Sequence, residues 1–213
     1  SLDNFYAFFT ALFAEIICLI AAGAILADKP QGYIQRCAIG MFGFMLFGVA
    51  LAHLGYLAND KLFRPMILLV LLSVELNDVF AFCAGKLLGH RKLIPHTSPN
   101  KTIAGSLGAI IGTSVVVYFF GRQIFAGTVL QHPGHLLALG IMISVVGQLG
   151  DLMLSSVKRD LSIKDMSDLI PGHGGLLDRF DSLILVGPAV FHYVNYFHGI
   201  GTGEQTRIFS GTL

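Results

Sequence analysis

Long apolar segments recur along the chain, and each is long enough to cross a lipid bilayer as an α-helix. Six such segments can be drawn, at about residues 4–27, 37–57, 65–85, 103–121, 133–154 and 182–198. A helix of roughly 20 apolar residues crosses about 30 Å of hydrocarbon and satisfies its own backbone hydrogen bonds there. Alternating strands of a membrane barrel are not visible. The sequence therefore predicts an all-α, polytopic membrane bundle that forms a single domain over residues 1–213.

The composition supports this class and excludes others. Apolar residues make up 54% of the chain and charged residues 13%, about half the share found in soluble proteins. The net charge of +1 gives no reason to expect a nucleic-acid partner. Cys18, Cys37 and Cys83 are scattered without a CxxC spacing, so neither a zinc site nor a disulfide framework is indicated.

The basic residues are distributed unequally between the two sides of the predicted bundle. The connections 28–36, 86–102 and 155–181 fall on one side and carry ten of them: Lys29, Arg36, Lys86, Arg91, Lys92, Lys101, Lys158, Arg159, Lys164 and Arg179. The other side carries Lys61, Arg64, Arg122 and Arg207. Cytoplasmic loops are the ones enriched in Lys and Arg. We therefore expect the connections 28–36, 86–102 and 155–181 to face the cytoplasm, in a bacterial inner membrane.

Residues 155–181 hold nine of the 27 Asp, Glu, Lys and Arg residues of the chain. Lys158, Arg159 and Lys164 offer donors for phosphate oxygens. Asp178 and Asp181 are three residues apart and would share one helix face if the last span begins there. The plain alternative is a solvated, charged loop around a glycine-rich turn.

Acidic residues also fall at the cytoplasmic ends of two spans. Asp78 lies in the third span before its cytoplasmic exit, and Asp151 lies near the end of the fifth, one turn before residues 155–159. A carboxylate at membrane depth is costly, so it needs a partner, a wet cavity or a function. Together with Asp178 and Asp181, these residues predict an all-oxygen site for a hard divalent cation such as Mg²⁺.

Two further segments have the composition of phosphate-binding loops. In the sequence PGHGG at residues 171–175, the glycines Gly174 and Gly175 let the backbone approach a ligand closely, and His173 offers a phosphate contact or a proton relay. The connection 86–102 adds Ser98, Lys101 and Thr102 before a glycine-spaced helix. Phosphoryl or nucleotidyl transfer needs such positioned cations more than it needs covalent help.

These residues resemble the signature of the phosphatidate cytidylyltransferase (CDP-diacylglycerol synthase) family. The signature positions are Ser155, Lys158, Arg159, Lys164, Asp165, Ser167, Pro171, His173, Gly174, Gly175, Asp178, Arg179 and Asp181. Upstream, the resemblance extends to Asp78, Ala81, Phe82, Gly85, Pro95, Ser98, Pro99, Lys101, Thr102, Gly105, Gly108, Gly150 and Asp151. Two positions depart from the pattern, because Phe82 replaces a tyrosine and Ala104 a glutamate. The family commonly has more than six helices, and the absence of further amino-terminal helices is left open at this point.

The resemblance implies transfer of the cytidylyl group of CTP to phosphatidic acid, giving CDP-diacylglycerol and pyrophosphate. It implies a requirement for Mg²⁺, with K⁺ often nearby. Lys158, Arg159, His173, Asp178 and Asp181 are the expected catalytic residues. The expected substrate contacts are Ser98, Lys101, Thr102, Ser155, Lys164, Gly174, Gly175 and Arg179, and the expected metal ligands are Asp151, Asp178, Asp181 and Asp78.

Other functions stay open at this point. A CTP-dependent kinase or cytidylyltransferase acting on a polyprenol, phytol or archaeal lipid would use similar residues. A transporter or channel would line a permeation path with Asp78, Asp151 and Asp181, and a noncatalytic scaffold is a further alternative. The expected partners are CTP, phosphatidic acid and membrane lipids, with a homodimer left open.

Overall fold

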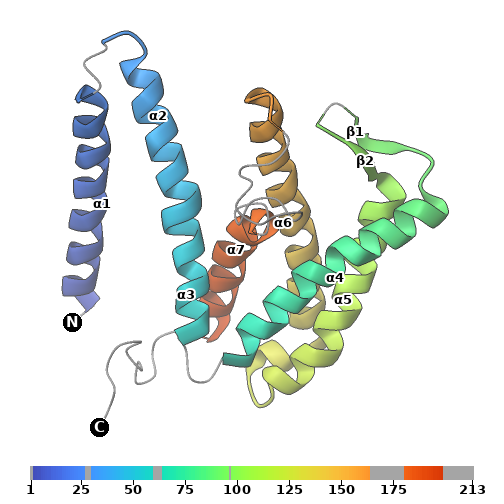
Figure 1. Ribbon diagram of the computed structural model, residues 1–213. Coiled ribbons are helices and arrows are strands. Elements are labelled where there is room, and N and C mark those ends of the chain that lie inside the picture. Colours follow the sequence, from blue (N-terminus) through green and yellow to red (C-terminus); the bar gives the residue numbers. More distant parts are fainter. Residues whose placement is uncertain (1, 27–29, 60–63, 96, 164–179, 199–213) are drawn as a thin grey trace. The chain divides into compact units, whose positions relative to one another are not determined.

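The computed structural model describes residues 2–26, 30–59, 64–95, 97–163 and 180–198 (Figure 1). The chain forms two compact units, Ser1–Val49 and Ala50–Leu213.

The first unit consists of two helices in direct contact. These are α1 (Leu2–Ile25) and α2 (Tyr33–Gly43). The Tyr33 hydroxyl donates a hydrogen bond of 3.3 Å to the Ala21 carbonyl. A Cβ atom on Gly40 would lie only 2.6 Å from the Ile20 side chain, so the glycine permits this close approach. Beyond α2 the helix continues as a π-helical stretch, η1 (Phe44–Ala50), and then as α3 (Leu51–Asn59).

The second unit is a bundle in which consecutive helices are neighbours. It contains α3, α4 (Arg64–Leu88), α5 (Ile103–Ile124), α6 (Pro133–Asp160) and α7 (Asp181–His198). Helix α4 packs on α5, α5 on α6, α6 on α7, and α7 on α3 (Figure 1). A 3₁₀ turn, η2 (Val129–Gln131), precedes α6. An antiparallel hairpin, β1 (Lys92–Ile94) and β2 (Ser98–Thr102), connects α4 to α5.

The surface and interior of this bundle are those of an integral membrane protein. Large apolar side chains such as Leu68, Ile111 and Phe119 are exposed on the outside, while Asn77 and Ser144 are buried inside. Four segments of the described chain are long and apolar enough to cross a membrane: Tyr33–Ala58, Met66–Leu88, Ile103–Ile124 and Pro133–Asp160. The prediction of an all-α, polytopic membrane bundle is confirmed. That α1 and α7 also cross the membrane, as the count of six spans requires, stays a prediction.

Glycines on α5 bring this helix unusually close to α4. A Cβ on Gly105 would lie 2.6 Å from the Ala81 carbonyl, one on Gly108 2.2 Å from the Ala84 Cβ, and one on Gly112 2.4 Å from the Phe80 ring. Small residues at such spacings let helix backbones meet, which is how membrane helices gain packing energy. The contact fixes the end of α4 against the start of α5.

Two features differ from the sequence-based expectation. Helix α6 extends six residues beyond the expected boundary of 154, so Ser155, Lys158 and Arg159 lie on a helix and not in a loop. Hydropathy marks where a helix leaves the apolar layer, whereas basic residues in a last turn favour its continuation into water. The expected loop 86–102 contains a β-hairpin, whose strands of three and five residues are too short to give a detectable alternation.

Candidate functional site

Charged side chains from three parts of the second unit meet at one end of the bundle. Lys101, near the end of β2, forms an ion pair with Asp151 on α6, and each side chain retains about a fifth of its exposure (22% and 23%). The Ser155 hydroxyl, one turn further along α6, donates a hydrogen bond of 3.2 Å to Asp151 Oδ1. The two basic connections 86–102 and 155–163 therefore lie at the same end of the bundle.

The start of α7 reaches this end because of a glycine. A Cβ on Gly150 would lie 2.6 Å from the Asp181 carbonyl oxygen and 3.1 Å from the Ser182 Cα. With only hydrogen at this position, the first turn of α7 lies directly against α6. Asp151, the next residue on α6, is thereby brought within electrostatic range of Asp181.

Asp181 lies in surroundings that disfavour its charged form. It precedes the apolar part of α7, and burial is the largest cause that raises its pKa to about 6. The charge of Asp151 raises the pKa further, and Asp78 adds a smaller effect. The Ser182 N–H, which donates a hydrogen bond of 2.6 Å to Asp181 Oδ1, and the charge of Lys158 act in the opposite direction.

Two other hairpin residues that we expect to contact substrate, Ser98 and Thr102, differ in their structural surroundings. Thr102 is buried and caps α5, because its hydroxyl accepts a hydrogen bond of 3.1 Å from the Gly105 N–H. A Cβ on Gly85 would lie 2.9 Å from that hydroxyl, so the end of α4 packs directly on the cap. Ser98 is half-buried at the start of β2. The geometry thus gives Thr102 a structural role, and its contact with substrate stays a prediction.

The last turn of α6 presents two cations. Lys158 is half-buried, and its charge is felt at Asp181. Arg159 is exposed. Of the other expected site residues, Lys164, His173, Gly174, Gly175, Asp178 and Arg179 lie outside the described residues. The expectation that Asp178 and Asp181 share one helix face is therefore untested, since the described part of α7 begins at Asp181.

The carboxylates at this end of the bundle are chemically suited to bind a hard cation, but those among the described residues do not form a complete metal site. Asp78, Asp151 and Asp181 repel one another and supply carboxylate oxygens, the ligands that Mg²⁺ prefers. Within the described residues, however, no three His, Cys, Asp or Glu side chains stand close enough to hold a metal ion. Lys101 also lies on one oxygen of Asp151. The magnesium centre stays a prediction that depends on Asp178.

A polar network that sequence analysis missed runs from this end into the bundle. Asn77 Oδ1 on α4 accepts hydrogen bonds from Thr113 on α5, at 3.1 Å, and from Ser144 on α6, at 2.5 Å. Gln148 donates to the Ser144 hydroxyl at 3.1 Å and accepts a hydrogen bond from the Ser106 hydroxyl. Single Ser, Thr and Asn residues are common in membrane helices. Each of these residues taken alone therefore does not indicate a network, which becomes visible only when the helix faces that carry them meet.

Replacing Asn77 by Ala should destabilise the bundle, because two buried hydroxyls lose their common acceptor. Interhelical hydrogen bonds in membranes contribute about 1–2 kcal/mol at most in peptide systems, so we expect a loss of about that size in the free energy of unfolding. Ser73→Ala, one turn earlier on α4, is the control. Ser73 is buried and has no hydrogen-bond partner among the described residues. Equal losses for both variants in thermal melts would contradict the network.

Comparison with known proteins identifies relatives over almost the whole chain. Residues 2–197 match the Cytidylyltransferase family. The chain is 33% identical to the uncharacterized protein YnbB of Escherichia coli (strain K12), over 84% of this chain and 60% of that protein. It is 32% identical to a phosphatidate cytidylyltransferase of Rickettsia bellii, over 84% of this chain and 79% of that one.

A third relative covers a shorter stretch at higher identity. It is a phosphatidate cytidylyltransferase of Bacillus subtilis (strain 168), 42% identical over 57% of this chain and 44% of that protein. The chain thus spans between 44% and 79% of the length of these three relatives. With the match over residues 2–197 and these identities, the chain belongs to the cytidylyltransferase family.

Proposed function

We propose that this chain transfers the cytidylyl group of CTP to phosphatidic acid, forming CDP-diacylglycerol and pyrophosphate. The observation that carries the proposal is the family match over residues 2–197. Relatives of the chain that are named phosphatidate cytidylyltransferase support it. The charged end of the second unit supports it. Lys101, Lys158 and Arg159 supply cations, and Asp151 and Asp181 supply carboxylates, beside the start of α7.

The reaction balances as a single displacement at phosphorus. A phosphate oxygen of the lipid forms a bond to the α-phosphorus of CTP, the bond from that phosphorus to the bridging oxygen breaks, and pyrophosphate leaves. Such transfers depend on positioned reactants and on cations near the developing charge. Lys158 and Arg159, on the last turn of α6, are suited to bind the phosphates through charged hydrogen bonds.

A magnesium ion would be held by Asp151, Asp181 and Asp178, with Asp78 nearby, and when bound it would neutralise charge on the triphosphate. Lys101, which forms an ion pair with Asp151, is a further cation at this end of the bundle and is suited to donate to a substrate phosphate. The excess of Lys and Arg on this side supports a reaction site at the cytoplasmic face of the membrane, which we propose is a bacterial inner membrane.

An assay of pyrophosphate release tests the proposal. Protein purified in neutral detergent with Mg²⁺ should release pyrophosphate when CTP and phosphatidic acid are present together, and not with either alone. No release with both substrates, from protein that retains its helical circular dichroism, would refute it.

The same assay separates the alternatives. Product analysis with labelled CTP should show a labelled CDP-lipid for phosphatidic acid and none for a polyprenol or phytol. Transfer to one of those alcohols in its place would assign the chain to another lipid. Ion flux through reconstituted vesicles without pyrophosphate release would instead favour a channel or transporter.

A further inference from the structure

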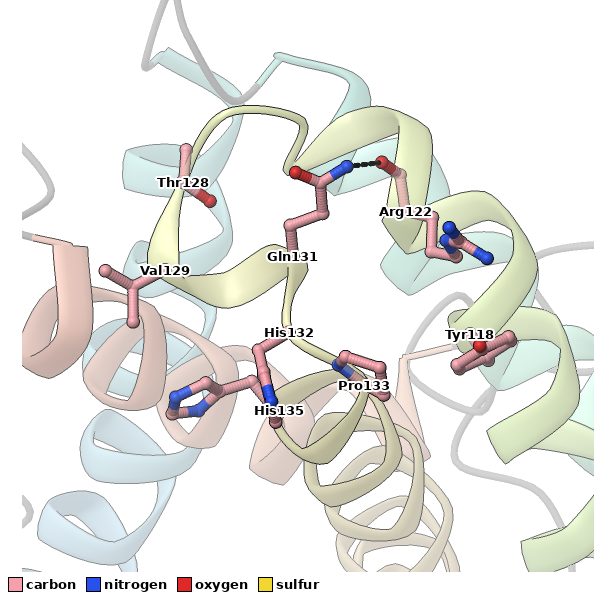
Figure 2. A pocket seen from close by; sticks show the side chains of 8 residues that line it. All are labelled: Tyr118, Arg122, Thr128, Val129, Gln131, His132, Pro133 and His135. Carbon is pink, nitrogen blue, oxygen red and sulfur yellow. Dashed lines mark hydrogen bonds between the residues drawn. The ribbon is translucent and has the colours of Figure 1, made fainter.

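A cavity lined by apolar surface and several polar groups lies at the other end of the second unit, where α5 turns into α6 (Figure 2). Its volume is about 580 Å³, and it is lined by Tyr118, Arg122, Thr128, Val129, Gln131, His132, Pro133 and His135. Helix α5 has 22 residues, which corresponds to a length of about 33 Å. The cavity is therefore separated from Lys101 and Asp151 by the full thickness of the hydrocarbon layer, and it is no part of the proposed reaction site.

The lining of the cavity offers hydrogen-bond donors and no acid. None of its eight lining residues is Asp or Glu. The Arg122 guanidinium lies over the Tyr118 ring, 5.8 Å from the ring centre, which holds the cation beside the cavity. Arginine presents a planar fork of donors that matches the oxygens of a phosphate group.

Local hydrogen bonds fix the turn and orient its donors. Gln131 donates to the Arg122 carbonyl at 3.4 Å and accepts from the Gly127 N–H at 3.1 Å, so its amide ties the two sides of the turn together (Figure 2). His132 caps α6, because its Nδ1 accepts a hydrogen bond of 3.2 Å from the Gly134 N–H. The proton of the neutral ring is then on Nε2, which leaves that atom as a donor.

The surroundings of the cavity are apolar and exposed. Val129 in the lining is 61% exposed, and Phe119 and Phe120 on the adjacent turn of α5 are 65% and 50% exposed. The exposed Phe rings are suited to contact acyl chains, and Tyr118 in the lining is of a residue type enriched at the level of the lipid headgroups. A ligand that fits both features has an anionic phosphate for Arg122 and His132 and apolar chains for the outer face of α5.

We propose that this cavity binds a phosphate group, supplied by an anionic glycerophospholipid of the leaflet opposite the proposed reaction site. The phosphate accepts hydrogen bonds from Arg122 and from His132 Nε2, and the acyl chains lie along the exposed residues of α5. The cavity thus gives the protein a lipid contact on a membrane face where the cytidylyl transfer has no substrate.

Lipid-dependent thermal stability tests this proposal without reference to enzymatic activity. The full chain in neutral detergent is melted by circular dichroism while short-chain phosphatidylglycerol, short-chain phosphatidylcholine or inorganic phosphate is added. We expect phosphatidylglycerol to raise the melting temperature more than phosphatidylcholine does. Arg122→Gln should weaken the apparent affinity roughly tenfold or more, because a charged donor fork is lost.

Two further variants make the result specific. His132→Asn keeps a cap for the Gly134 N–H but removes Nε2, so it should melt like wild type without lipid and respond less to phosphatidylglycerol. Gln123→Ala changes an exposed neighbour that does not line the cavity and should respond fully. A shift with inorganic phosphate that Arg122→Gln abolishes would assign the site to free phosphate. Equal responses of Arg122→Gln and wild type to every additive would overturn the proposal.

Discussion

Replacing Asp181 by Asn is expected to lower pyrophosphate release from CTP and phosphatidic acid roughly a hundredfold or more. Loss of a group that merely supports a metal ligand typically costs 10- to 100-fold in affinity or activity, so loss of Asp181, which we propose as a ligand, should cost at least as much. The substitution is nearly isosteric, and the amide oxygen still accepts the hydrogen bond from the Ser182 N–H. The fold should therefore be retained.

Stability and activity should respond to this change in opposite directions. Burial and the charges of Asp151 and Asp78 oppose ionisation of Asp181, so removing its charge relieves repulsion. The melting temperature of Asp181→Asn should equal or exceed that of wild type in magnesium-free buffer. A rate that recovers partly at raised Mg²⁺ would show that cation binding is the property lost.

Asp160→Asn is the matched control, since it removes one negative charge from the exposed end of α6. It should retain close to the full rate. An Asp181→Asn variant with wild-type turnover and an unchanged magnesium requirement would exclude Asp181 from the reaction site.

Sequence alone predicted which residues would gather at one end of the bundle better than it predicted their pairing. Asp151 and Lys101 were both expected at the cytoplasmic end, but as a metal ligand and a substrate contact. Their ion pair depends on the register of the hairpin, where Lys92 faces Thr102, and on the close packing of α5 against α4. Neither follows from hydropathy or from a motif, because both are set by contacts between distant segments.

The buried polar network and the cavity were missed for a related reason. Asn77, Thr113 and Ser144 are each unremarkable in an apolar helix, and only the packing of three helices brings them together. Arg122 was counted only as a topology signal, and the donors around it belong to a turn whose geometry is fixed by Gln131 and His132. Motif spacing indicates candidate site residues but carries no information on such long-range contacts.

Replacing Gly150 by Ala should reduce activity roughly tenfold to a hundredfold while leaving most of the helical structure intact. The added Cβ would lie 2.6 Å from the Asp181 carbonyl oxygen, and backbone cannot rotate away as a side chain can. The first turn of α7 must then move away from α6, and Asp181 moves with it. Displacement of reacting groups by about 1 Å can cost a hundredfold in rate.

Gly147→Ala provides a control on the same helix and against the same partner. Its Cβ would meet the Val186 side chain at 3.4 Å and the Ser182 Cβ at 3.8 Å, which are ordinary contacts. We therefore expect a near wild-type rate of pyrophosphate release from this variant, with a melting temperature close to that of wild type. If Gly150→Ala and Gly147→Ala lose activity equally, the spacing of α6 and α7 at Asp181 does not control the reaction. If Gly150→Ala alone is impaired and Asp151 and Asp181 hold the proposed ion together, its magnesium requirement should rise, because the added Cβ moves Asp181 away from Asp151.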